Sequence, residues 1–489
     1  MPSSLVIRTR RNAALALLFV LSGLPLWTQA LVSDDSSRIP VVSSFSGSPL
    51  LLDVSVPDPE GTLRAVTFRT DVSTIDYRVH ADPERDALRL YVSPFLASGV
   101  HELEIVADHG SRGSVENRLR VGFVDFVWGR DNLSFGNNSQ YTSVIGTFGE
   151  ILETWLDERF GEIPAADRIL LIDYMYSLFG RNTGRCYAFA GTEVRYWRRP
   201  ELLPTYYDSV HDLSGAVSRY QREMNYLQFD IVFDHFLAGP GAAQIARPMS
   251  RDELSDQALE IERRISSGEP VAVGFAGPDL HHSMLVFGFV RDPGNETFDL
   301  LVANNWKSDE KLNIHSRDAE IIRISLGPDL DGPMVQWRYS DGVRDREIDR
   351  LFVVDVRRGR YVHDRAHLDT LVAQLIETVR AGDRTIVVVE EADAALVTDG
   401  ELVTGLVRNR ARTELEAVWY ERIGRAQRFS CEPHVDLILE VTDDSRARVL
   451  MLVPRDDGSF DAETRLAAAP ASGETTVHRI EIARSGSAP

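Results

Sequence analysis

Cysteine is nearly absent from this chain of 489 residues, which contains only Cys186 and Cys431. Two cysteines are too few for a disulfide scaffold, so the fold must depend on ordinary hydrophobic cores. A single disulfide between them is the alternative, and it would leave no thiol for chemistry.

Lysine is also rare, because Lys307 and Lys311 are the only two and arginine supplies nearly all the positive charge. Acidic residues outnumber basic ones by 74 to 53, which gives a formal net charge of −21. An acidic surface repels phosphate backbones and anionic lipids, so we expect no nucleic-acid partner.

Long apolar runs are missing except at the start of the chain. Arg8, Arg10 and Arg11 precede an almost wholly apolar stretch from Ala13 to Trp27, and small residues follow at Thr28–Ala30. This pattern predicts a signal peptide over residues 1–30, with an uncleaved anchor as the alternative. We therefore expect a secreted or periplasmic protein, or one associated with the cell surface, with no stable membrane insertion after cleavage.

Motifs for cofactors and metals are absent as well. No phosphate-binding glycine loop and no serine elbow is found. His281 and His282 are adjacent, but neighbouring strand residues point to opposite faces and cannot share a metal. Asp329–Gly332 lacks the further carboxylates of a calcium loop, so we predict neither a metal nor a cofactor.

The first of the two cysteines stands where a helix is expected to begin. Asn182, Thr183 and Gly184 precede Cys186, and a helical pattern follows until Pro200. Backbone N–H groups and the helix dipole at such a position favour thiolate, the nucleophilic form.

Two predicted strands supply the groups that a thiol nucleophile needs. His281–Phe289 opens with histidine, and Phe298–Trp306 ends in Asn304, Asn305 and Trp306. An imidazole can take the thiol proton, and an amide can fix the orientation of the imidazole. Pairing with the imidazole would lower the pKa of Cys186.

These three segments resemble those of the papain-like cysteine peptidases, over roughly residues 130–356. Cys186–Ala190 resembles the start of the family's catalytic helix, and Gly288 follows His282 by six residues, as in the family. Asn304 stands two residues before Trp306. The resemblance therefore implies a triad of Cys186, His282 and Asn304.

The chain departs from the family at several positions. Gly180 replaces the glutamine that helps to form the oxyanion hole, so we assign that role to Asn182 together with the Cys186 N–H group. Tyr187 replaces the family's tryptophan, and the interval from Cys186 to His282 is shorter than is usual. The resemblance is thus that of a divergent relative of the family.

The fold class expected is multidomain α+β. Short strands with regular turns over residues 31–126 predict an immunoglobulin-like β-sandwich. The resemblance implies a papain-like catalytic domain over 127–358, with one helical and one antiparallel β lobe. An amphipathic helix at 366–381 opens a β-rich domain over 359–489.

The predicted function is that of an exported cysteine peptidase acting on a peptide or protein substrate; nothing indicates its oligomeric state. One alternative is a papain-fold binding or surface protein without activity, which the glycine at position 180 favours. The other is a transglutaminase-like acyltransferase, which would use aspartate as the third residue where this chain has Asn304.

Overall fold

In a computed structural model, the chain forms two compact units. Unit 1 comprises residues 1–136, 186–214 and 239–358, and unit 2 comprises residues 137–185, 215–238 and 359–489. The residues that the structure describes are 52–57, 64–70, 77–82, 87–92, 99–126, 130–137, 148–179, 185–213, 218–237, 244, 247–277, 280–294, 296–305, 320–326, 335–338, 346–357, 361, 363–382, 384–390, 392–398, 401–407, 410–413, 418–423, 426–431, 437–443, 448–455, 459–466 and 476–482. The predicted signal peptide lies outside the described residues.

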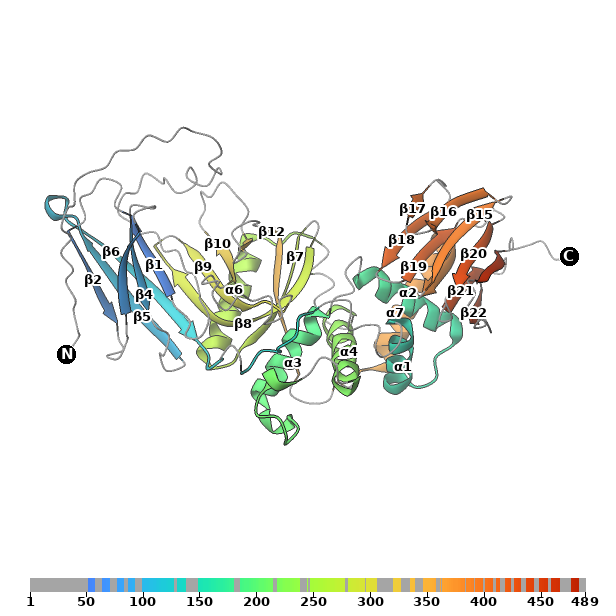
Figure 1. The fold of residues 1–489 in the computed structure, drawn as a ribbon, viewed down its shortest axis with the longest axis horizontal. Coiled ribbons are helices and arrows are strands. Elements are labelled where there is room, and N and C mark those ends of the chain that lie inside the picture. Colours follow the sequence, from blue (N-terminus) through green and yellow to red (C-terminus); the bar gives the residue numbers. More distant parts are fainter. Residues whose placement is uncertain are drawn as a thin grey trace. The chain divides into compact units, whose positions relative to one another are not determined.

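Unit 1 consists mainly of antiparallel strands (Figure 1). Its strands are β1 (Leu52–Pro57), β2 (Ala65–Thr70), β3 (Tyr77–Asp82), β4 (Ala87–Val92), β5 (Gly99–Asp108), β6 (Ser114–Phe123), β7 (Val271–Gly277), β8 (Leu280–Asp292), β9 (Thr297–Ala303), β10 (Glu320–Ser325), β11 (Val335–Arg338), β12 (Arg346–Ile348) and β13 (Arg350–Val354). Its helices are α3 (Cys186–Arg198) and α6 (Arg251–Ser266).

The strands of unit 1 form two sheets. A three-stranded sheet has the order β1-β4-β3, and a ten-stranded sheet runs β12-β11-β10-β9-β8-β6-β5-β2, with β7 paired to β8 and β13 paired to β7. The link between β6 and β8 joins Phe123 to Gly288. The boundary predicted at residue 126 therefore does not separate two sheets, because a strand from before it pairs with one from after it.

Local sequence signals explain the two helices. Ser250 caps α6 by accepting from the Glu253 N–H group, and the Glu253 side chain accepts from the Ser250 N–H group in return. Helix α3 contacts β7 and β8, and ten of its thirteen residues are buried. Burial at this level fixes the start of α3 against the sheet.

Unit 2 combines helices with two sheets of five strands each. Its helices are α1 (Phe148–Phe160), α2 (Ala165–Phe179), α4 (Ser218–Val232) and α7 (Arg365–Gly382), with a π-helical turn at Phe233–Leu237. Its strands are β14 (Thr385–Glu390), β15 (Asp393–Thr398), β16 (Glu401–Val407), β17 (Arg410–Thr413), β18 (Val418–Ile423), β19 (Ala426–Cys431), β20 (Leu437–Asp443), β21 (Arg448–Pro454), β22 (Phe460–Leu466) and β23 (Thr476–Ile482).

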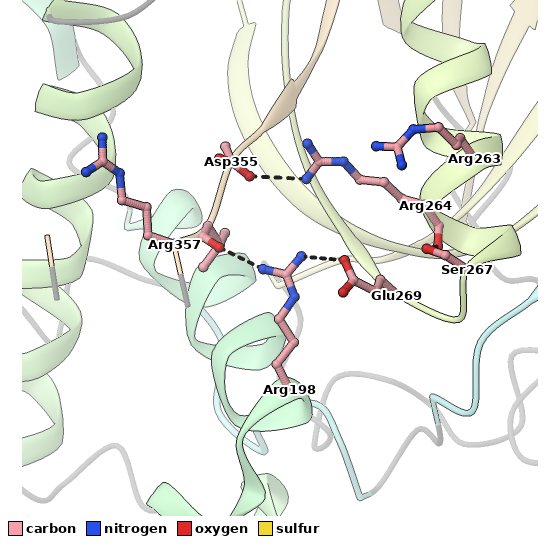
Figure 2. A pocket seen from close by; sticks show the side chains of 8 residues that line it. Arg198, Arg263, Arg264, Ser267, Glu269, Asp355 and Arg357 are labelled. Atoms are coloured by element: carbon pink, nitrogen blue, oxygen red, sulfur yellow. Dashed lines mark hydrogen bonds and ion pairs between the residues drawn. The ribbon is translucent and has the colours of Figure 1, made fainter. Parts of the chain in front are cut away.

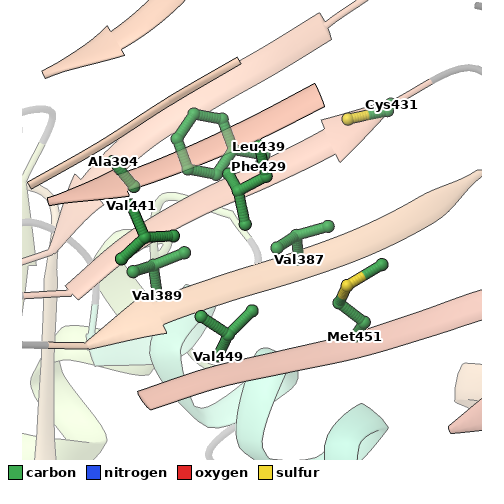
Figure 3. Packing of buried hydrophobic residues seen from close by; sticks show 9 residues of the cluster. All are labelled: Val387, Val389, Ala394, Phe429, Cys431, Leu439, Val441, Val449 and Met451. Atoms are coloured by element: carbon green, nitrogen blue, oxygen red, sulfur yellow. The ribbon is translucent and has the colours of Figure 1, made fainter. Parts of the chain in front are cut away.

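The two sheets of unit 2 have the orders β18-β19-β14-β21-β22 and β17-β16-β15-β20-β23. Buried side chains from strands of both sheets form one core (Figure 3). Phe429 and Val387 come from the first sheet, Leu439 comes from the second, and Cys431 belongs to the same cluster. Cys431 is therefore a core thiol.

The coarse fold prediction is confirmed, because the structure combines helices with antiparallel sheets. The amphipathic helix predicted at 366–381 is α7, and it leads into β-structure as expected. None of the described helices is both long enough and apolar enough to span a bilayer.

A candidate thiol site at the start of α3

The candidate site lies where β9 separates from β8. The two strands are paired antiparallel from Asp292 and Thr297 to Leu285 and Ala303. Continuing this register beyond the end of β9 brings Asn305 opposite Ser283. Pairing between β8 and β9 ends at Leu285 and Ala303. On the edge of β8 that faced β9, the backbone of Ser283 can therefore bond to other partners.

The Asn305 side chain joins β8 to the start of α3. Its Nδ2 atom donates to the Ser283 carbonyl at 2.9 Å and to the Cys186 carbonyl at 3.2 Å. Both bonds are buried and connect residues far apart in the sequence. A single amide thus fixes the first residue of α3 to the open edge of β8.

Three backbone N–H groups surround the Cys186 sulfur: its own, that of Tyr187 and that of Ser283. The first two belong to the N-terminus of α3, where N–H groups lack helical partners. Such donors favour the thiolate and so act to lower the pKa.

Burial nevertheless dominates the pKa of this thiol. Cys186 is 8% exposed, and the loss of water raises its pKa to about 12, in spite of the three N–H donors. The expected lowering of this pKa is therefore wrong for the structure as it stands. Both cysteines are free thiols, so no disulfide between them removes the nucleophile.

The two histidines of β8 have different surroundings. His281 Nε2 lies 2.6 Å from the hydroxyl of Tyr187, on α3. His282 pairs with Phe275 of β7, and the two rings meet edge to face with centroids 5.5 Å apart. Because side chains alternate along a strand, His282 points to the face opposite His281. Tyr187 of α3 thus bonds to His281, the neighbour of the predicted base His282.

A glycine makes room for this contact. Gly274 pairs with Ser283, and a Cβ atom there would lie 2.8 Å from the Tyr187 hydroxyl and 2.2 Å from the Phe352 ring. Any larger residue would push Tyr187 or Phe352 away from β7. The absence of a side chain at position 274 therefore allows α3 to approach the sheet closely.

Helix α3 also carries a buried carboxyl group two turns after Cys186. Burial raises the pKa of Glu193 to about 8, although its Oε1 accepts from the Leu133 N–H group at 3.2 Å, and the charge of Asp131 raises this pKa further. Among the described residues, its Oε2 atom has no hydrogen-bond partner. Glu193 is therefore largely protonated at neutral pH.

The predicted nucleophile lies against the strand that carries the predicted histidine. Cys186 meets β8 at Ser283, the residue directly after His282, and His282 and Asn304 are buried at 1% and 5% exposure. Asn182 lies outside the described residues. The contacts that hold the thiol come from Ser283, Asn305 and Tyr187, each next to a predicted residue. Only this adjacency in the sequence could have indicated them.

Among the described residues, no group of three or more His, Cys, Asp or Glu side chains could hold a metal ion. No family model matches the chain, and no curated protein matches it.

Proposed function

We propose that the chain is an exported cysteine peptidase of papain-like type, with Cys186 as nucleophile, a histidine of β8 as general acid and base, and Asn304 as the residue that orients the imidazole. The family spacing assigns the base to His282, and His281, which lies on the face of β8 that meets α3, is the alternative. Asn182 and the Cys186 N–H group stabilise the oxyanion. The signal-peptide pattern of residues 1–30 supports export.

One observation carries the proposal. The N–H group of Ser283 hydrogen-bonds to the Cys186 sulfur, so a thiol at a helix N-terminus meets the strand residue next to His282. These residues are 97 positions apart, and a nucleophile and its base are commonly brought together in this way by folding.

The raised pKa of Cys186 determines when the thiol loses its proton in the first step of the proposed reaction. Since the sulfur is protonated at rest, the imidazole takes the proton as sulfur attacks the peptide carbonyl. The C–N bond then breaks, the leaving amine takes that proton, and a thioester remains on Cys186. Water hydrolyses the thioester and restores the thiol.

The decisive experiment measures cleavage of an unbiased peptide library by the exported protein. Cys186→Ala should abolish cleavage, while Cys431→Ala serves as a matched control because Cys431 is a buried core thiol with a pKa also raised to about 12. Cleavage that survives Cys186→Ala at the parent rate would refute the proposal.

Separate variants of the two histidines identify the base. His282→Gln should reduce kcat at least about a hundredfold, as expected for loss of a general base. His281→Gln should act mainly through stability, because His281 is bonded to Tyr187. The opposite result would transfer the catalytic role to His281.

The burial of the thiol favours a second candidate, a non-catalytic binding protein. A sulfur with a pKa of about 12 carries almost no thiolate at neutral pH. Such a protein would retain peptides from the library without releasing products. Retention unaffected by Cys186→Ala, together with no cleavage, would favour this candidate.

A further inference from the structure

A pocket in unit 1 lies at the opposite end of α3 from Cys186. It encloses about 400 Å³ between the ends of α3, α6 and β13 (Figure 2). Its lining consists of Arg198, Arg263, Arg264, Ser267, Glu269, Asp355, Val356 and Arg357. Arg198, which ends α3 and lines the pocket, is about 18 Å from Cys186 along the helix axis, at a rise of about 1.5 Å per residue.

The pocket is positively charged although the protein is acidic. Four arginines line it against two carboxylates, Glu269 and Asp355, in a chain with a net charge of −21. A third carboxylate, Glu260, pairs with both Arg263 and Arg264 from outside the lining. Even with Glu260 included, the arginines exceed the carboxylates.

The two carboxylates of the pocket differ in how strongly arginines bind them. Arg198 binds Glu269 at 3.0 Å and the Val356 carbonyl at 2.7 Å, and its side chain is 10% exposed. Asp355, by contrast, is 71% exposed and lies 3.3 Å from Arg264. An exposed ion pair of this kind contributes little stability, so another anion can replace Asp355 at low cost.

Capping of helix α6 does not use up the arginine donors. The last carbonyls of α6 accept from the N–H groups of Ser267, Gly268 and Glu269, and the Ser267 hydroxyl donates to the Arg264 carbonyl. In addition, the Nε atom of Arg198 is buried and has no hydrogen-bond partner among the described residues. Guanidinium donors thus remain for a ligand.

We propose that this pocket binds an oxyanion group, a carboxylate or a phosphate, through Arg198, Arg263 and Arg264. Planar guanidinium groups match both oxyanions and can bind them through paired hydrogen bonds. The incoming anion takes the place of Asp355 at Arg264. Binding does not depend on the proposed peptidase function, because it involves none of the residues at the thiol site.

Calorimetric titration of the full chain at low ionic strength tests the proposal with two probes. One is inorganic phosphate, and the other is a capped peptide of three glutamates, with a three-glutamine peptide as its neutral counterpart. Binding of the glutamate peptide alone identifies a carboxylate ligand, and binding of phosphate alone identifies a phosphate ligand. If neither probe binds, the proposal is wrong.

Variants locate the binding. Arg264→Gln and Arg263→Gln should each weaken it at least fivefold, and Arg263 is 66% exposed, so its replacement should not disturb folding. Arg291→Gln is the control, since Arg291 is outside the pocket and also pairs with a glutamate, Glu262. Equal weakening by Arg291→Gln would mean that the probes bind through general charge attraction.

Removal of the competing carboxylate gives an independent result. Asp355→Asn should tighten binding at least twofold, because Arg264 then lacks its weak partner. Asp125→Asn is matched in residue type and exposure, at 71%, but Asp125 is not among the pocket residues. An equal gain from both variants would contradict the proposed displacement. Repeating the titrations in Cys186→Ala keeps this result separate from peptidase activity.

Discussion

The hydroxyl of Tyr187 and the Nε2 atom of His281 lie 2.6 Å apart and connect α3 to β8. Tyr187 follows the candidate nucleophile directly, and His281 precedes the predicted base directly. This bond therefore holds the start of α3 against the start of β8. Burial raises the pKa of Tyr187 well above its usual value, so the hydroxyl keeps its proton at all working pH values.

Tyr187→Phe tests this connection by removing a single oxygen atom. We expect the free energy of unfolding to fall by about 1–2 kcal/mol, because a buried hydrogen bond is lost while the ring stays in place. Urea denaturation measures the change. Tyr206→Phe is the control, as Tyr206 is 74% exposed and its variant should differ from the parent by less than about 0.5 kcal/mol. An equal loss of free energy of unfolding in both variants would show that the Tyr187–His281 hydrogen bond does not stabilise the fold.

The sequence predicted the elements around the site better than the side-chain directions within them. Helix α6 runs from Arg251 to Ser266, and both of its ends are marked in the sequence, by the serine cap at Ser250 and by the Ser-Ser-Gly turn. Strand β6 is less evident from its sequence. Glu116, Arg118 and Arg120 alternate with inner positions, and the buried Asn117 interrupts the apolar residues of that inner face.

The choice between His281 and His282 shows the limit of spacing arguments. The six-residue interval from His282 to Gly288 matched the family, but the register of β8 shifts between Val286 and Gly288. Since one residue of shift reverses the face of a strand, spacing to Gly288 cannot fix which histidine faces α3. Pairing of β6 with β8 was likewise hidden, because it joins segments about 170 residues apart.

Glu193 should make stability depend on pH in an unusual direction. Its pKa is raised to about 8 in the folded chain and is near 4.5 when unfolded. Glu193 therefore allows full stability below pH 4.5, where it is protonated in both the folded and the unfolded chain. The free energy of unfolding then falls as the pH rises towards 8, because only the unfolded chain can ionise this group freely. Glu193→Gln should abolish this slope and stabilise the protein by about 3 kcal/mol at pH 7, as measured by urea denaturation across this range.

Glu260→Gln provides a control with the opposite sign. Hydrogen bonds from Arg263 and Arg264 lower the pKa of Glu260 to about 2, so its contribution is present above pH 4.5 and is lost only towards pH 2. The slope between pH 4.5 and 8 should survive in this variant. If the slope also survives in Glu193→Gln, another group produces it.

Asp230 holds three segments of unit 2 together. It accepts from Trp155 and Arg159 of α1 and contacts the His363 ring, each at 2.9 Å. Burial alone would raise its pKa, but the bonds from Arg159 and His363 outweigh burial and lower it. Its contribution to stability is thus present above about pH 4 and is lost as the pH falls through this lowered pKa.

Asp230→Asn should lower the free energy of unfolding by about 3–5 kcal/mol at pH 7, because Arg159 is left without a carboxylate partner. Asp157→Asn is the control: Asp157 is 55% exposed and pairs with Arg168, so the expected loss is below about 1 kcal/mol. Thermal or urea unfolding compares the two. A similar loss of stability in both variants would mean that the buried Asp230–Arg159 pair stabilises the fold no more than the exposed Asp157–Arg168 pair does.

Asn305→Leu tests whether the side-chain amide anchors the start of α3. The substitution leaves the carbonyls of Cys186 and Ser283 without this donor, at an expected cost of about 1–3 kcal/mol. Local opening should then expose the sulfur, so alkylation of Cys186 by iodoacetamide should become several times faster. Peptide mass spectrometry reads Cys431 in the same sample, and because this thiol lies in the core of unit 2 its rate is the internal control. Acceleration at both thiols would indicate global unfolding, whereas acceleration at Cys186 alone would show that the Asn305 amide controls access to the Cys186 sulfur.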